Sequence, residues 1–512
     1  MWLKRTLALL LLPLLLLTGC WSDEPPEEDT TILPTSDVEE PVEEEHTALP
    51  AAFSLPYFPD QTLNPYTCAD GAQQDLGTLL YEGLYRLDET FTAQPQLCAS
   101  ASYDAAALTW TFQLQPAAAF SDGSPLTAAD VVTSWNLAKA SPRYAARFST
   151  ILSFAGADGG ITVRLNRANA LLPNLLDIPV IKASTASSLT PLGTGPYALS
   201  QDESGPCLLS SPAWWNGATP PAQRIALAPV KDADILLYQF SSHEIQLITS
   251  DLTGQSPVSV AGNVMFRDAD TAVLQYVGFN TQTPLLQSAA VRQTLSLGIN
   301  RGKAVSALLS GHAKAAQFPI SPVSPLYPKE LEQEFSHERF TRALIQTGLS
   351  GGQNQILTML VNEENSFKVA LARSVAASLS AGDLTVQVKT LPWEAFQAAL
   401  RAGDYDLYYG ETRLTADWDL RRLAAFGGSL NYRGYSNPGL ELQMATFAAS
   451  GTASAALGLM KAFQEQMPFI PVCFKTASVL VQKDVVDGLN PTAANPFYGL
   501  EDWTLHLADD TD

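Results

Sequence analysis

Alternating and helically spaced apolar positions in DLTVQVKTLPWEAFQAAL, residues 383–400, predict a strand, a short loop and a helix. In the first half, apolar side chains take every second position, which is the period of a half-buried strand. A second stretch, 289–309, is predicted to be helical, with Val291 and Leu295 on one face. Strands that alternate with helices indicate an α/β protein built in layers.

A polar segment separates a further predicted strand from the predicted helix that follows it. The strand is predicted at LTWTFQLQ, residues 108–115, and Asp122-Gly123 follows it as a turn signal. Thr127 lies three residues before Asp130, which resembles a capping box with Asp in the usual place of Glu. Apolar residues at helical spacing come next. These residues by themselves imply a tight turn and a capped helix, with no chemistry.

The first twenty residues have the layout of a secretory signal peptide. Lys4 and Arg5 precede an apolar core from Leu7 to Leu17, which is short for a membrane span of about 20 residues. The core ends in small residues and then Cys20, and this resembles the lipobox of bacterial lipoproteins. The resemblance implies acylation of the Cys20 thiol and a lipid anchor in the cell membrane. A plain membrane-anchor helix with an incidental cysteine is the alternative.

Residues 21–47 are predicted to be a disordered acidic tether. They contain eleven acidic residues, four prolines and no Lys or Arg. Such a segment cannot bury enough apolar surface to fold, and its charges extend it by repulsion. Of the net charge of −22, the leader contributes +2 and the tether −11, which leaves −13 for the body. An acidic body argues against nucleic-acid binding, and its charge is explained by solubility.

The body, from about Ala48 to Asp512, is long enough for two or more domains. It has no second apolar run that could span a bilayer, so we expect the body to be soluble and to lie outside the cell. The compartment permits disulfides, but the cysteine spacing suggests no metal or redox site, and separate thiols are favoured. These cysteines are Cys68, Cys98, Cys207 and Cys473.

Most of the familiar enzyme and metal motifs do not occur in the sequence. We find no HExxH, phosphate loop or GxGxxG, and a GxSxG string occurs once, from Gly348 to Gly352. We predict a protein that is not an enzyme and needs no cofactor or metal. The histidines are scattered, and none pairs with another at ligand spacing: His46, His243, His312, His337 and His506.

The stretch FSDGSPLTAADVV, residues 120–132, resembles the signature of the family 5 extracellular solute-binding proteins, the peptide, oligopeptide and nickel-binding lipoproteins of ABC importers. Other stretches resemble the same family in its order and cover nearly the whole body. They are LNPY (63–66), LYEGLYRLD (80–88), GTGPYAL (193–199), YVGFNTQTPLLQSAAVRQTLSLGINRGKAV (from 276), YDLYYG (from 405), NYRGYSNPGL (from 431) and MPFIPVCF (from 467).

The resemblance implies a two-lobed, periplasmic-binding-protein-like α/β fold with a hinge. Its first lobe would be discontinuous and would combine 48–267 with 469–512, and its second lobe would span 268–468. Ligand would bind in the cleft between the lobes, and closure would sequester it from water. The resemblance implies a monomeric binding subunit that captures peptides and delivers them to an ABC permease and ATPase complex.

The same resemblance implies a set of ligand-binding residues. Asp417, in TADW, would accept the ammonium group of a peptide, because a buried ammonium needs a charged acceptor. Capping of the predicted helix WDLRRLAAF is the alternative role for Asp417. Arg413 could hold a ligand carboxylate or form a surface salt bridge. Trp393 and Tyr276 could line the cleft or pack in the core, and Trp418 is predicted to be a core residue.

Two other functions remain open at this point. The same fold could bind another solute, such as a nickel chelate, haem, a sugar or a signalling peptide, although no histidine cluster favours nickel. A surface hydrolase is a third and less favoured possibility.

Overall fold

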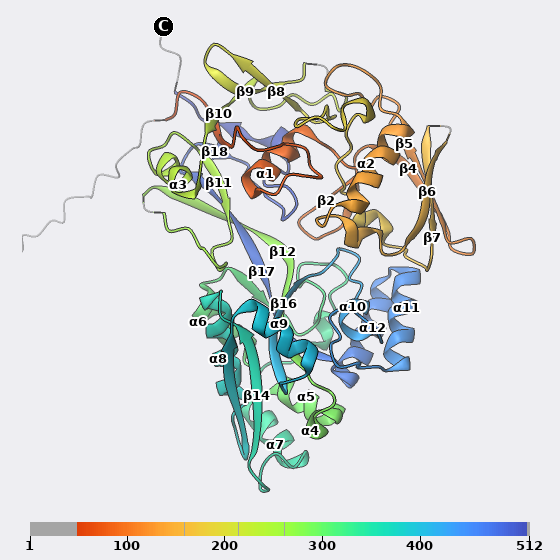
Figure 1. Ribbon diagram of the computed structural model, residues 1–512, viewed down its shortest axis with the longest axis vertical. Helices are drawn as coiled ribbons and strands as arrows, with labels where there is room; N and C mark the ends of the chain where they lie inside the picture. The colour runs from red at the N-terminus through yellow and green to blue at the C-terminus, as the bar shows by residue number, and fades with distance from the viewer. Residues whose placement is uncertain (1–48, 158, 213, 261, 509–512) are drawn as a thin grey trace, which may run out of the picture. The chain divides into compact units, whose positions relative to one another are not determined.

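The strands of this protein form two groups of sheets, each with its own hydrophobic core (Figure 1). The computed structural model describes residues 49–508 except 158, 213 and 261. The predicted signal peptide, the lipidation site Cys20 and the tether therefore lie outside the described residues.

The first group contains two four-stranded sheets. In the sheet β1-β10-β9-β8, β1 and β10 run parallel and the other neighbours antiparallel. The sheet β4-β5-β7-β6 is antiparallel throughout. The bounds are β1 (Ser54–Tyr57), β4 (Cys98–Asp104), β5 (Thr109–Leu114), β6 (Ile151–Ala157), β7 (Gly160–Leu165), β8 (Tyr197–Asp202), β9 (Gly205–Ser210) and β10 (Arg224–Pro229).

Helices and two two-stranded sheets complete this group. The helices are α1 (Gly71–Leu80), α2 (Ala128–Ala140) and α3 (Ala233–Ser241). The paired short strands are β2 (Tyr85–Leu87) with β3 (Ala93–Pro95), and β18 (Val486–Asp487) with β19 (Thr504–Leu505). The first core draws on residues from Phe53 to Leu247 and again from Val479 to Trp503, as a discontinuous first lobe requires.

The second group is built on a seven-stranded mixed sheet in the order β11-β17-β12-β16-β14-β15, with β13 paired to β17. Its core draws mainly on residues from Ala272 to Phe474. The strand bounds are β11 (Leu247–Ser250), β12 (Val264–Phe279), β13 (Ala313–Ala315), β14 (Gln355–Asn362), β15 (Leu384–Leu391), β16 (Leu407–Arg413) and β17 (Phe469–Gln482).

Helices of the second group connect and cover its strands. They are α4 (Pro284–Gln287), α5 (Ala289–Leu297), α6 (Arg301–Leu309), α7 (His337–Gln346), α8 (Ser366–Leu379), α9 (Trp393–Ala402), α10 (Arg421–Ala424), α11 (Pro438–Ser450) and α12 (Ala453–Gln466). Because β14 pairs in parallel with both β15 and β16, α8 and α9 are crossover helices of βαβ units. The predicted α/β class is confirmed.

Strands β12 and β17 pair along most of their length and run side by side between the two groups (Figure 1). Val479 and Val481 of β17 belong to the first core, whereas Phe474 belongs to the second. The pairing shifts register between Asp270 and Leu274 of β12, and such irregularities bend a strand. This strand pair is where we expect a hinge, and the predicted lobe boundaries stay a prediction.

Local sequence patterns gave accurate elements. Thr127 is the N-cap of α2, and Asp130 Oδ2 accepts hydrogen bonds from its backbone N at 3.0 Å and its Oγ1 at 2.6 Å. The predicted strand, loop and helix over 383–400 are β15 and α9. The stretch 289–309 forms two helices rather than one, because α5 ends at Leu297 and Asn300 caps α6. The turn before α2 is also longer than predicted, spanning 115–127.

Three further observations concern chemistry and compartment. The four cysteines of the described chain are free thiols, as the sequence favoured, and all are buried. His, Cys, Asp and Glu side chains do not gather in threes to form a metal site within the described ranges. No helix in the part of the chain that the structure describes has the length and apolarity to cross a membrane.

Candidate functional site

Asp417 lies buried in the turn that follows β16, with 7% of its surface exposed. Its Oδ1 accepts a hydrogen bond from Thr415 Oγ1 at 2.5 Å, and its Oδ2 accepts one from Asn169 Nδ2 at 2.9 Å. Burial raises the pKa of the Asp417 carboxyl, and the nearby Asp419 carboxylate raises it further. Among the described residues, Asp417 has no ion-pair partner. It is therefore a buried acid that no positively charged side chain neutralises.

Asn169 comes from the first group of sheets, and the bond to Asp417 is one of several between the segments 167–174 and 415–421. Arg167 forms an ion pair with Asp419 at 3.3 Å. Asn174 Nδ2 donates to the carbonyl oxygen of Ala416 at 3.1 Å. Asp417 therefore belongs to a polar contact between residues of the two cores. The void beside it is about 10 Å³, which is room for one water-sized group.

The helix-cap alternative for Asp417 is wrong. The helix α10 begins only at Arg421, and the backbone N of Arg421 donates to Asp419 Oδ1 at 3.0 Å and not to Asp417. Trp418 is buried, as predicted, and its ring meets Phe91 and Phe474 edge-on. The turn that buries Trp418 also turns Asp417 toward Asn169.

Arg413 is the last residue of β16, and it is exposed. Its side chain forms no hydrogen bond or ion pair with any other described residue, so the surface salt-bridge alternative is wrong. Desolvation lowers the pKa of its guanidinium, and the positive charges of Arg143 and Arg147 lower it further. The Arg413 guanidinium is therefore exposed, unpaired and free to meet an anionic group.

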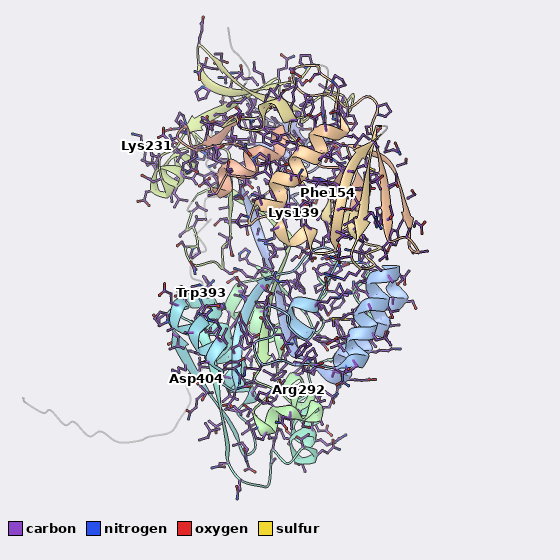
Figure 2. All side chains as sticks on the ribbon, turned by 45° about the vertical axis from the view of Figure 1, so that its right-hand side comes forward. Lys139, Phe154, Lys231, Arg292, Trp393 and Asp404 are labelled. Carbon is purple, nitrogen blue, oxygen red and sulfur yellow. The ribbon has the colours of Figure 1, made fainter. Side chains whose placement is uncertain are left out.

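Trp393 and Tyr276 have different environments. Trp393 is the first residue of α9 and is 51% exposed, so the core alternative for it is wrong (Figure 2). Its backbone N donates to Glu364 Oε1 at 2.5 Å, which fixes the start of the helix. Tyr276 is only 2% exposed, and its ring meets Tyr408 and Phe469 edge-on. Tyr276 packs as a core residue, and its contact with a ligand stays an untested prediction.

Sequence reasoning missed a buried polar cluster around Lys475, which lies on β17. Lys475 is 3% exposed and pairs with Asp251 and the carbonyl oxygen of Thr253. Asn365, the N-cap of α8, donates to that same carbonyl at 2.9 Å. The cluster thereby ties the segment after β11 to β17 and α8. Lys475 is the one charged residue between Phe469 and Gln482, and that isolation in an apolar run was the available signal.

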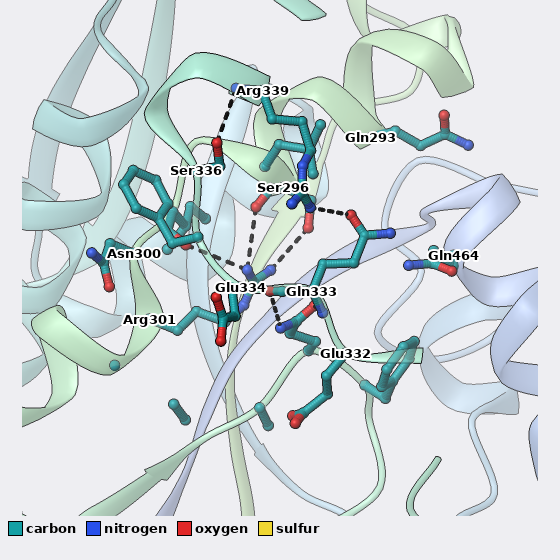
Figure 3. Close-up of a pocket in the computed structure, with 18 of the residues that line it drawn as sticks. Gln293, Ser296, Asn300, Arg301, Glu332, Gln333, Glu334, Ser336, Arg339 and Gln464 are labelled. Atoms are coloured by element: carbon teal, nitrogen blue, oxygen red, sulfur yellow. Dashed lines mark hydrogen bonds between the residues drawn. The ribbon is translucent and has the colours of Figure 1, made fainter. Parts of the chain in front are cut away.

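A separate cavity of about 510 Å³ lies within the second group (Figure 3). Arg301 reaches into its wall, but the guanidinium donates to Pro471 O at 2.8 Å and Ser296 Oγ at 2.9 Å. The carboxylates of Glu332 and Glu334 lie on the same wall. None of the predicted ligand-binding residues lines this cavity, and Arg301 serves the packing of the second group.

Comparisons with known proteins agree with this architecture. The family model described as bacterial extracellular solute-binding proteins, family 5 Middle, matches residues 92–432. The oligopeptide-binding protein AppA of Bacillus subtilis (strain 168) is 21% identical over 413 residues, which is 73% of this chain and 76% of AppA.

Solved structures share the fold at low identity. The unliganded open form of MppA, a periplasmic murein tripeptide binding protein, superposes with a TM-score of 0.75 at 18% identity, over 90% of this chain and 98% of MppA. A nickel ABC transporter structure from Bacillus halodurans gives a TM-score of 0.71 at 17% identity, over 88% of this chain and 98% of that one. The two-lobed, periplasmic-binding-protein-like fold predicted from the sequence is confirmed.

Proposed function

Since this chain belongs to the bacterial extracellular solute-binding proteins of family 5, we propose that it captures peptides and delivers them to the permease of an ABC importer. Membership of the family makes it a solute-binding protein of an extracytoplasmic compartment. Its relatives are binding proteins and not enzymes. The peptide as ligand and the delivery step are our inference.

The observation that carries the proposal is the buried Asp417 carboxylate without a positive partner. Water solvates a carboxylate far better than a protein interior does, so a buried one gains from a cation that enters beside it. A peptide ammonium supplies that charge, and a small void of about 10 Å³ lies beside Asp417. The bonds from Thr415 and Asn169 hold the carboxylate in position.

The remaining predicted residues have supporting roles in this proposal. The unpaired guanidinium of Arg413 is suited to a ligand carboxylate, because its planar fork matches two oxygens. The exposed ring of Trp393 offers an apolar wall. Tyr276 supports β16 from the core side, through its contact with Tyr408.

Binding would close the two lobes by a movement of the β12 and β17 strand pair. Residues 48–267 with 469–512 would move as the first lobe and 268–468 as the second. The ligand would favour the closed state, because it would contact both lobes only in that state. The closed monomer would be the form that an ABC permease and ATPase complex recognises.

Native mass spectrometry of protein purified without denaturation tests the ligand class. We expect co-purified masses in the range of short peptides, which disappear after unfolding and refolding. A nickel chelate, haem or a sugar in their place would contradict peptide capture while leaving the family assignment intact. Turnover of a peptide panel by the purified protein would favour the hydrolase alternative.

We also propose that Cys20 carries the lipid that anchors the protein to the cell membrane. Cys20→Ser removes the acylated thiol, so the variant is expected to leave the membrane fraction and appear in the soluble extracytoplasmic fraction. Detergent partitioning and the intact mass of the mature chain measure the change. A variant that stays in the membrane fraction with unchanged partitioning would overturn the lipobox assignment.

A further inference from the structure

A cavity of about 370 Å³ in the first group of sheets lies outside every predicted site. Its volume falls in the range of about 300–1,000 Å³ that is usual for small-molecule pockets. It lies between the starts of α1 and α3, next to β11. Most of its wall is apolar and comes from Leu55, Phe58, Leu76, Leu236, Leu247, Ile248 and Phe497.

Asp75, in α1, is an acidic residue of this cavity that does not cap a helix. Its Oδ2 accepts a hydrogen bond from Thr249 Oγ1 at 2.5 Å. Its Oδ1 has no hydrogen-bond donor among the described residues, and the side chain is partly open to the cavity. Desolvation nevertheless raises the pKa of Asp75 to about 6, against smaller opposing effects of Thr249 and Arg143. The cavity therefore holds a carboxylate that has lost water without gaining a cation.

The other charged residues of the cavity are differently engaged. Asp70 caps α1 through the backbone N of Gln73 at 3.0 Å, and Asp232 caps α3 through that of Ile235 at 2.9 Å. Lys231 lies at the exposed start of α3 (Figure 2) and forms no ion pair with the described residues. Asp70 and Asp232 are each held by a helix end through one oxygen, whereas Asp75 is held only by the hydroxyl of Thr249.

Charged residues link the surroundings of this cavity with those of Arg413. Thr249, which binds Asp75, is two residues from Asp251, which pairs with Lys475 of the crossing strand. The charge of Arg143 acts on both Asp75 and Arg413. A ligand that extends from the vicinity of Arg413 could thus place one side chain in the cavity.

We propose that this cavity binds an alkylammonium group, the side chain of a lysine in the captured peptide, with Asp75 as its counter-ion and the apolar wall around its methylenes. The proposal rests on peptide capture as the proposed function. An ammonium completes the hydrogen bonding of Asp75 Oδ1, and four methylenes match walls of leucine and phenylalanine. A free diamine has the same chemistry and is the other source of such a group.

Isothermal titration with alanine-based peptides that carry either lysine or norleucine tests the proposal. Norleucine keeps the aliphatic chain and lacks the ammonium. Charged hydrogen bonds contribute about 1.5–3 kcal/mol, so we expect lysine peptides to bind roughly 10- to 100-fold more tightly. Asp75→Asn should abolish that preference. Asp232→Asn, a matched carboxylate that only caps α3, should keep it.

The pH dependence gives a second readout. The carboxylate of Asp75 must be ionised to hold a cation, so the lysine preference should fall as pH decreases through about 6. Any loss that comes from Asp417 is shared by norleucine peptides, so the ratio of the two affinities reports on Asp75 alone. Because the folded pKa is raised, ionised Asp75 costs stability above about pH 6, and Asp75→Asn should melt at the same or a higher temperature at pH 7.5.

The outcomes separate this inference from the proposed function. If no peptide of either kind binds, peptide capture itself fails. If both peptides bind equally, or if Asp75→Asn retains the preference, the ammonium pocket is overturned and peptide capture stands. Cadaverine that binds as tightly as the lysine peptide, in an Asp75-dependent way, would support the pocket and identify a free diamine as its source.

Discussion

Asp417→Asn is expected to weaken the binding of peptides with a free N-terminus by roughly 30- to several-thousand-fold. The estimate follows from the cost of removing one partner of a buried charge pair, about 2–5 kcal/mol. The Asp417 carboxylate is buried and unpaired by any cation of the described chain, so a ligand ammonium would supply its whole counter-charge. Titration calorimetry measures the loss directly.

N-acetylated peptides complete the test. Acetylation should weaken wild-type binding by a similar factor and hardly affect Asp417→Asn, because the charge pair is already broken. The four dissociation constants then give the coupling between the carboxylate and the ammonium. If Asp417→Asn binds both peptide forms as wild type does, Asp417 serves only the contact with Asn169.

The fold of Asp417→Asn should persist, because Asn preserves the local hydrogen bonds. Its side-chain oxygen can accept from Asn169 Nδ2, and its amide can donate to the hydroxyl of Thr415, which rotates to suit. Since burial raises the pKa of Asp417, removing the charge should leave stability at neutral pH unchanged or higher.

Asp419→Asn is the matched control for this experiment. The Asp419 carboxylate already pairs with Arg167 at 3.3 Å and Arg421 at 3.1 Å. Its loss should loosen the contact between the segments 167–174 and 415–421, and affect free and acetylated peptides equally. A selective loss of free peptides in Asp419→Asn would move the ammonium site to that residue.

The parts of the fold that sequence predicted are those that short stretches determine. The pair Thr127 and Asp130 marks the start of α2 because both partners of the bond lie within one turn. Likewise, β15 and α9 follow from their own apolar periods. The break between α5 and α6 was also locally encoded, since Asn300 accepts from the backbone N of Lys303 at 3.1 Å, and it was missed.

Such local patterns do not indicate contacts between residues that lie far apart in the sequence. The partner of Asp417, Asn169, is 248 residues away in sequence, and the partner of Lys475, Asp251, is 224 residues away. Periodicity also does not indicate where a core ends. Trp393 has the spacing of the buried face of α9, which Phe396 and Leu400 form, yet as the first residue of the helix it lies largely outside the core.

Gly278→Ala is expected to be among the most destabilising single substitutions in the second core. Gly278 lies on β12 opposite Tyr408 of β16. A Cβ at this position would lie 2.1 Å from Cε1 and Cζ of the Tyr408 ring. That ring cannot easily withdraw, because Tyr276, Tyr405 and Tyr432 meet it edge-on at centroid distances of 5.5–5.7 Å. The glycine is thus required by an aromatic ring packed across it.

The expected cost of Gly278→Ala is about 3 kcal/mol, at the upper end for overpacking, read from the shift in urea unfolding. The double variant Gly278→Ala/Tyr408→Leu should be more stable than the sum of the single changes predicts by at least about 1 kcal/mol, because the smaller side chain leaves room for the methyl group.

Gly302→Ala is the control, since its Cβ meets no atom within 4 Å on the surface of α6, and it should be neutral or slightly stabilising. A wild-type unfolding midpoint for Gly278→Ala would mean that the Tyr408 ring moves aside without cost. The strand β12, which pairs with both β16 and β17, would then tolerate a side chain opposite Tyr408.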